Sequence, residues 1–94
     1  MGENDWFTSP IRTIRLEPLF EHQIRNLGIA AERLDYALVG LGESLARHPE
    51  IFPKVPATPF SRATLNVYGG LPSLRVFFTY NAVEVALVCV EFTE

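Results

Sequence analysis

The residues that could carry out chemistry are few and dispersed along the chain. The two histidines, His22 and His48, lie 26 positions apart, and the single cysteine, Cys89, stands within a run of apolar residues. A metal site needs several such ligands at characteristic spacings, so we expect neither a metal ion nor another cofactor. No serine has histidine and acid partners in a pattern that favours a hydrolase, and no glycine pattern predicts a phosphate-binding loop. The sequence therefore shows no complete catalytic site.

Arg75 is the residue that we single out for contact with another molecule. It stands at the start of an aromatic-rich run, where its guanidinium could bind an anion or a carboxylate of a partner. A cross-strand ion pair is the alternative interpretation. Tyr68 and Tyr80 could stack on nucleic-acid bases, or they could be tyrosines at the rim of the core. The sequence leaves both choices open.

The composition excludes some classes of function. At 94 residues the chain is long enough for one domain with an adequate core. Its net charge is −3 and Lys54 is its only lysine, so it lacks the clustered basic surface that binds phosphate backbones. Binding to nucleic acid is therefore not expected. The hydrophobic content of 48% is high for so short a chain and predicts an exposed apolar surface or an interface.

The sequence favours a cytoplasmic protein without a membrane anchor. Residues 1–5 are acidic where a secretory signal would be basic. No apolar run approaches the roughly 18 residues that a transmembrane helix needs. A lone cysteine excludes an internal disulfide and fits a reducing compartment.

The last third of the chain, residues 74–92, predicts the element that organises the fold. Two runs of β-branched and aromatic residues flank a short break at Asn81, which predicts an antiparallel hairpin. The second run is apolar on both faces: one face would hold Val83, Val85, Leu87 and Cys89, and the other Ala86, Val88, Val90 and Phe92. Because a chain of this length can hardly cover both faces of a sheet, this pattern predicts that a partner docks there.

Two strands and two helices precede the hairpin. Residues 11–17 and 61–68 alternate as strands do. Pro18 begins a short helix that Gly28 ends, and a leucine-rich stripe predicts a longer helix over residues 30–47. Segments between the elements are short or proline-rich, which predicts a packed chain.

These elements predict an α+β fold of order β-α-α-β-β-β, in which a two-helix hairpin packs on one face of a small twisted antiparallel β-sheet. Residues 1–10 would form an N-terminal arm, and residues 11–94 a single domain. Gly40 and Gly42 are costly inside a helix. We interpret them as sites of close packing against the first helix or the sheet, with a bend on partner docking as the alternative.

Three stretches carry a resemblance to a known family. They are the strand and helix start at 14–21, the helix stripe over 31–46 with the His-Pro-Glu run at 48–50, and the arginine strand 74–80 with the valine-rich strand 83–88. Together they resemble the RelE/ParE superfamily of type II toxin–antitoxin toxins, over about residues 11–92. The resemblance implies a RelE/ParE-like domain and a small antitoxin protein as its partner.

The resemblance also bears on activity. In the ribonuclease branch of that superfamily, catalytic lysines lie on the strand that precedes the arginine strand. The corresponding residues 62–68 of this chain include no lysine. That branch places an arginine and a tyrosine beyond its final strand, and here only residues 92–94 stand there. Arg75 alone matches a catalytic position, so we expect no active ribonuclease. The ParE branch, which poisons DNA gyrase without those residues, stays open.

The expected function is thus the toxin-like component of a type II toxin–antitoxin system, which binds an antitoxin segment in an apolar groove between the sheet and the second helix. The residues expected to form this site are Phe60, Tyr68, Arg75, Phe77 and Phe78, with Arg75 as the polar anchor. Two alternatives remain. One is a ribosome-dependent mRNA endoribonuclease that uses Arg75, and the other is a self-associating structural domain that forms a homodimer through the apolar sheet.

Overall fold

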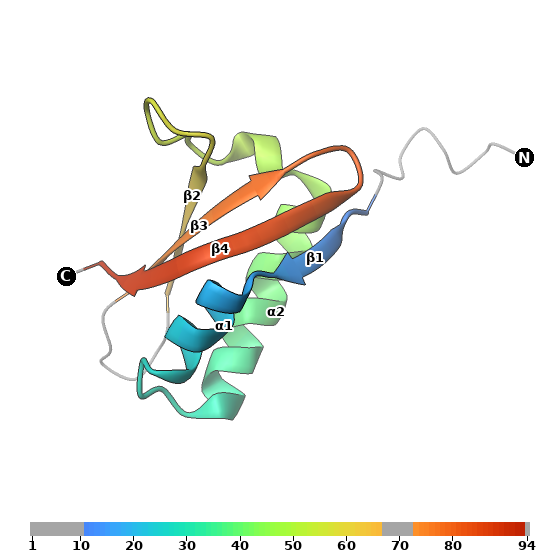
Figure 1. Cartoon of the computed structure of the whole chain (residues 1–94). Coiled ribbons are helices and arrows are strands. Elements are labelled where there is room, and N and C mark those ends of the chain that lie inside the picture. The colour runs from blue at the N-terminus through green and yellow to red at the C-terminus, as the bar shows by residue number, and fades with distance from the viewer. Residues whose placement is uncertain (1–10, 67–72, 94) are drawn as a thin grey trace, which may run out of the picture.

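The computed structural model describes residues 11–66 and 73–93. The predicted arm at 1–10 and Tyr68 lie outside the described residues. Two α-helices pack against a four-stranded sheet in the order β-α-α-β-β-β (Figure 1), which confirms the predicted α+β class. The elements are β1 (Thr13–Leu16), α1 (Pro18–Arg25), α2 (Ala31–Arg47), the short 3-10 helix η1 (Pro49–Ile51), β2 (Ser61–Leu65), β3 (Leu74–Tyr80) and β4 (Glu84–Phe92).

The sheet is mixed, whereas the sequence led us to expect an antiparallel one. The strand order is β1-β4-β3-β2, with β3 antiparallel to both of its neighbours and β1 parallel to β4. Thr13 is aligned with Glu84, and Leu16 with Leu87. A parallel pair needs a long crossover connection, which here contains both helices, β2 and β3. Alternation along residues 11–17 predicts a strand but carries no information about its direction.

A β-bulge interrupts β4. Phe77 is aligned with Cys89 and Phe78 with Leu87, so Val88 has no residue opposite it in β3. One extra residue in a strand shifts the alternation of its side chains by one position. The faces assigned from simple alternation are therefore wrong beyond Val88.

The bulge gathers the apolar residues of β4 on one side. Residues directly opposite each other in a sheet share a face. By this pairing the side toward α2 receives Val85, Leu87, Val90 and Phe92, and the outward side receives Glu84, Ala86, Cys89 and Glu91. The outward face of the sheet is consequently more polar than the sequence pattern predicted.

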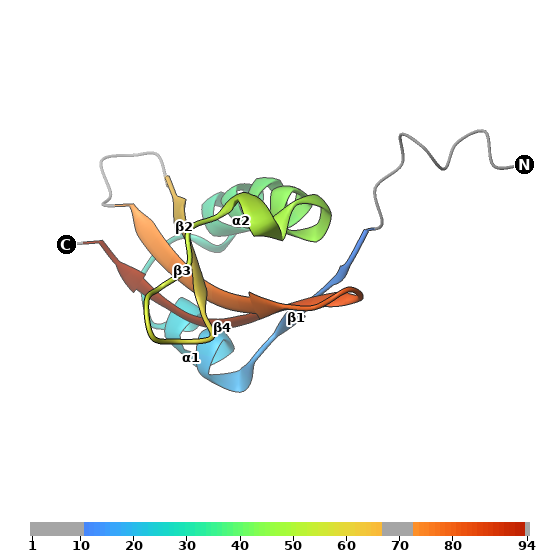
Figure 2. The ribbon, with the colours of Figure 1, turned by 90° about the horizontal axis from the view of Figure 1, so that it is seen from above.

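The two helices pack on the sheet in different ways (Figure 2). α2 lies across one face, in contact with β1, β2 and β4, whereas α1 contacts β4. α1 continues along β4 beyond the end of β1: the Glu17 amide donates to the Leu87 carbonyl at 2.9 Å, and the Val90 amide donates to Gln23 Oε1 at 2.8 Å. Gln23 thus satisfies an edge amide of β4 that the short β1 does not reach.

An apolar core joins these elements. Phe20 of α1, Leu45 of α2 and Phe78 of β3 have no solvent-exposed surface. The other buried members are Leu34, Leu41, Ala63, Leu65, Leu74, Val76, Val85, Leu87 and Val90. Because full burial of one large apolar side chain stabilises a fold by about 1.5–3 kcal/mol, this cluster fixes α2 and β4 relative to each other.

Prolines set two of the helix ends, as the sequence predicted. Gly28 does not cap α1 as expected, because the helix ends at Arg25 with Asn26 as its C-cap residue. Pro18 occupies the first turn of α1, and Gly28 follows that helix with a φ of 77°, in the left-handed region that glycine tolerates best. His48 closes the last turn of α2 through its backbone amide, and Pro49 ends the helix.

Gly40 and Gly42 do not pack closely against another element. A Cβ atom built at either position would meet no atom within 4 Å outside the neighbouring turns of α2. The close-packing interpretation of these glycines is therefore wrong, and both positions leave open space beside α2.

Candidate partner-binding site

An apolar groove runs between α2 and β1, and we call it the α2–β1 groove. Its volume is about 470 Å³, and it is lined by Ile14, Leu16, Asp35, Leu38, Val39, Leu41, Gly42 and Leu87. Leu16 is 41% exposed and Val39 68%, so apolar surface at the mouth of the groove faces solvent. Asp35 is the one charged residue in this lining.

Local structure explains why these residues meet. Asp35, Leu38, Val39 and Gly42 follow the i, i+3, i+4, i+7 spacing that places residues on one side of a helix. The missing side chain of Gly42 leaves space at one end of that side. Alternate residues of β1 point toward α2 from the sheet, and this brings Leu16 to the opposite wall.

The backbone of β1 adds a second feature to the groove. The Thr13 amide donates to the Val83 carbonyl at 3.0 Å. This hydrogen bond is the first of those that join β1 to β4. Alternate residues of such a strand direct their backbone groups to opposite sides, so Ile14 and Leu16 direct theirs away from β4. Within the described residues no strand pairs with this edge. At the start of this edge the Arg12 amide donates to the Ala46 carbonyl of α2 at 3.1 Å. The groove therefore has apolar walls and, beside them at Ile14 and Leu16, a strand edge that no described strand pairs with.

A second groove, of about 700 Å³, lies on the other side of α2 beside β2. It is lined by Glu32, Arg33, Tyr36, Ala37, Gly40, Leu41, Leu65 and Asn66. Although larger, it has a more polar rim, and residues 67–72, which follow Asn66, are not among those described. We therefore place the candidate site in the α2–β1 groove.

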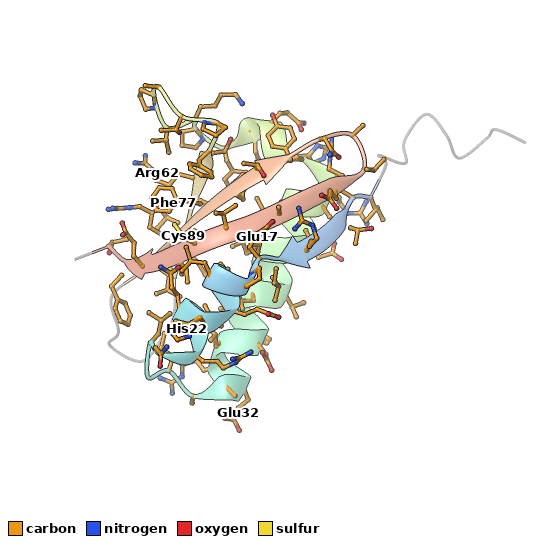
Figure 3. The ribbon with its side chains drawn as sticks, viewed as in Figure 1. Glu17, His22, Glu32, Arg62, Phe77 and Cys89 are labelled. Atoms are coloured by element: carbon orange, nitrogen blue, oxygen red, sulfur yellow. The ribbon has the colours of Figure 1, made fainter. Side chains whose placement is uncertain are left out.

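The sheet face away from α2 carries a row of three different side chains. Arg62, Phe77 and Cys89 lie next to one another on β2, β3 and β4 (Figure 3). Beside this row Arg75 donates to Glu91 across the strands at 2.9 Å. Burial raises the pKa of the Cys89 thiol, and the charge of Glu91 raises it further. The thiol is thus protonated at neutral pH, and a protonated thiol is a poor nucleophile.

Arg15 forms an ion-pair network on the same face. It donates to Glu84 at 3.1 Å and also to Glu17. Hydrogen bonds to Glu84 and then to Glu17, together with their charges, raise the pKa of Arg15 above its ordinary value. These exposed pairs hold β1 beside β4, and they present no unpaired base to a substrate.

The residues predicted to form one site are divided between surfaces. Phe78 is fully buried on the α2 side of the sheet, whereas Arg75 and Phe77 lie on the opposite face. Phe60 is half-buried at the end of the proline-rich connection. Tyr68 is outside the described residues. The structure thus brings Arg75 and Phe77 together on the outward face and places Phe78 in the core.

The surroundings of Arg75 supply little of what RNA cleavage needs. Its ion-pair partner is the carboxylate of Glu91, which offsets its charge.

Tyr80 lies at the rim of the core, where the charged groups of Arg12 and Lys54 are 5.7 and 5.4 Å from the centre of its ring. In the described part of the chain, no three histidine, cysteine or acidic side chains gather as a metal site.

Sequence reasoning missed most of the residues in the α2–β1 groove. It named a groove between the sheet and the second helix, but not Leu16, Leu38 or Val39 as its walls. One signal was available: Val39 is an apolar residue on the otherwise polar side of α2, where it gains nothing from the core. Leu16 carried no such signal, because its position depends on where β1 joins the sheet.

Comparison of the chain with models of known protein families found no match, and comparison with curated proteins found none either. None of the helices in the described ranges is both long enough and apolar enough to cross a membrane. What the site does must accordingly be argued from its own geometry.

Proposed function

We propose that this protein is the toxin-like component of a cytoplasmic type II toxin–antitoxin pair, and that an antitoxin segment docks in the α2–β1 groove. The observation that carries the proposal is the combination, in one groove, of solvent-exposed apolar walls with a strand edge that none of the described strands pairs with. The resemblance of the sequence to RelE/ParE toxins, in the order of elements and in the stretches around Ile14 and Arg75, supports the same function.

An extended antitoxin segment fits this site better than a helix does. Such a segment can add to the free edge of β1 through main-chain hydrogen bonds, and its alternate side chains can then fill the groove. The apolar walls favour aliphatic side chains, and the carboxylate of Asp35 favours one lysine or arginine. A basic segment is also attracted over longer range by the net charge of −3.

The ribonuclease alternative has less support. Cleavage through a ribose hydroxyl needs proton transfer at both ends of the reaction as well as charge stabilisation. Arg75 could provide part of the charge stabilisation, but its guanidinium is paired with Glu91. Docking of a protein segment requires none of these groups.

A binding measurement tests the proposal. Where the adjacent gene encodes a small protein, the chain is to be coexpressed with that protein and the Kd of the purified pair measured by calorimetry. Leu16→Asp places a charge against the apolar segment and should weaken binding about 100-fold, because a buried unpaired charge costs several kcal/mol. Asp35→Lys should weaken it less, by repelling the basic residue of the segment.

Val83→Asp is the matched control for Leu16→Asp. Val83 is 70% exposed at the tip of the hairpin and does not line the groove, so this variant should bind as the wild type does. Equal binding by Leu16→Asp and the wild type would contradict the proposal. If the chain arrests growth and cuts mRNA at defined codons, and if Arg75→Ala abolishes the cuts, the ribonuclease alternative replaces it.

A further inference from the structure

The side of α2 that faces away from the sheet has an unusual composition. It consists of Glu32, Tyr36, Val39, Gly40, Glu43 and Arg47, and we call it the outer face. Tyr36 is 81% exposed and Val39 68%, so two large apolar side chains lie in solvent without a partner in the core. Beside them Gly40 leaves open space on the helix surface.

These six residues are arranged symmetrically about the middle of the helix. Val39 and Gly40 are adjacent at the centre; Tyr36 lies three positions before Val39, and Glu43 three after Gly40. Glu32 and Arg47 lie seven positions from the same two central residues. Each group on one half of the helix therefore has a counterpart of complementary chemistry on the other half.

We propose that the outer face of α2 binds a second copy of this chain, with the two α2 helices antiparallel around a twofold axis between Val39 and Gly40. A twofold interface is self-complementary, so every contact occurs twice. Glu32 of each copy lies opposite Arg47 of the other, and the Tyr36 hydroxyl donates to Glu43. Val39 fills the space beside Gly40, where the absent side chain allows the helices to approach closely.

Charges along α2 favour this orientation over the parallel one. In a parallel pair Glu32 would lie near Glu32 and Arg47 near Arg47, which repels at both ends. In the antiparallel pair Arg47 lies between Glu43 of its own chain, which it already contacts at 3.4 Å, and Glu32 of the second copy. The 17 residues of α2 extend over roughly 25 Å, enough to hold both end pairs and the central contact.

This surface differs from the α2–β1 groove and from the sheet. Val39 borders both surfaces, but Glu32, Tyr36, Glu43 and Arg47 do not line that groove, so the charge variants that test the dimer leave the proposed antitoxin site unchanged. It also differs from a dimer formed through the sheet, because its contacts are charged at both ends. The two proposals can therefore fail separately.

Sedimentation equilibrium of paired charge variants tests the dimer. Glu32→Arg places two arginines opposite each other at both ends of the interface, and Arg47→Glu places two glutamates there. Each variant alone should raise the dimer Kd at least about tenfold. In an equimolar mixture of the two variants every end pair is again complementary, so association should return to the wild-type level. A protein that had simply misfolded would not recover on mixing.

Two variants on α1 serve as controls. Glu21→Arg and Arg25→Glu make the same changes of charge at exposed positions away from the outer face and should leave the wild-type Kd unchanged. A wild-type chain that stays monomeric to about 1 mM would overturn the proposal, since that limit corresponds to negligible affinity. So would a mixture that associates no better than either charge variant alone.

Discussion

The ion pair between Arg75 and Glu91 shows how one residue fits two interpretations of the sequence. From the sequence this arginine was expected either at a catalytic position or in a cross-strand pair, and the structure places its guanidinium 2.9 Å from Glu91. Both side chains are partly exposed, so the pair contributes little to stability, on the order of 0–1 kcal/mol.

The adjacent residues Phe77 and Phe78 test the face assignment of β3 directly. Phe78 is fully buried, and Phe78→Ala should lower the free energy of unfolding by about 3–5 kcal/mol because it leaves a cavity. Phe77 is half-buried on the outward face, and Phe77→Ala should cost about 1 kcal/mol. Urea denaturation monitored by circular dichroism measures both. Equal losses for the two variants would show that the strand does not present these faces.

At the level of elements, the bulge at Val88 has the largest consequence. Without it, Cys89 and Val90 would exchange faces, and the core side of β4 would lose an apolar residue that packs against Val76. Because of it, β4 presents a mainly apolar side to α2 and a mixed side outward. Exposed apolar surface consequently lies beside α2, at Val39 and at Leu16 of β1, more than on the outward face of the sheet.

Substitution by alanine should have opposite effects on stability at Gly42, inside α2, and at Gly28, which follows α1. Gly42→Ala should raise the free energy of unfolding by about 0.5–1 kcal/mol, because alanine favours the helix and its methyl group meets no obstacle. Gly28→Ala should lower it by about 1 kcal/mol, because a φ of 77° is strained for any residue with a Cβ atom. Thermal and urea unfolding measure both. A loss of stability in Gly42→Ala would mean that this position is packed after all.

At the level of the whole molecule, the contacts of β1 span nearly the full chain. Thr13 is aligned with Glu84, 71 positions away, whereas the pairs of β3 with β4 lie between 5 and 18 positions apart. Closing a long loop costs entropy before its contacts form, so the hairpin should form early and β1 should join late.

Folding kinetics test this order. Ile14→Ala should mainly speed unfolding, by up to about tenfold, because the contacts of β1 are absent from the transition state. Val76→Ala should mainly slow folding, because Val76 belongs to the hairpin. Stopped-flow measurements in urea give both rates, and each variant must lose more than about 0.6 kcal/mol for the comparison to be valid. Slower folding of Ile14→Ala with unchanged unfolding would contradict the order.

The sequence by itself determined the order and type of the elements and most of their ends. Pro18 and Pro49 act on their own backbone, and the leucine stripe of α2 follows from helical periodicity, so local chemistry was sufficient. Sequence reasoning also named a groove between the sheet and the second helix, although it placed the surplus apolar surface on the uncovered face of the sheet. These features depend on residues within a few positions of one another.

Only the tertiary structure decided the direction of β1, which side chains of β4 face the core, and which residues form the walls of the candidate groove. Leu16 faces α2 because β1 pairs with a strand some 70 residues away, and Val90 faces the core because Val88 has no partner in β3. Neither pairing is encoded in the residues next to it. Register and strand direction are set by contacts between distant segments, and the candidate site of this protein is built where those segments meet.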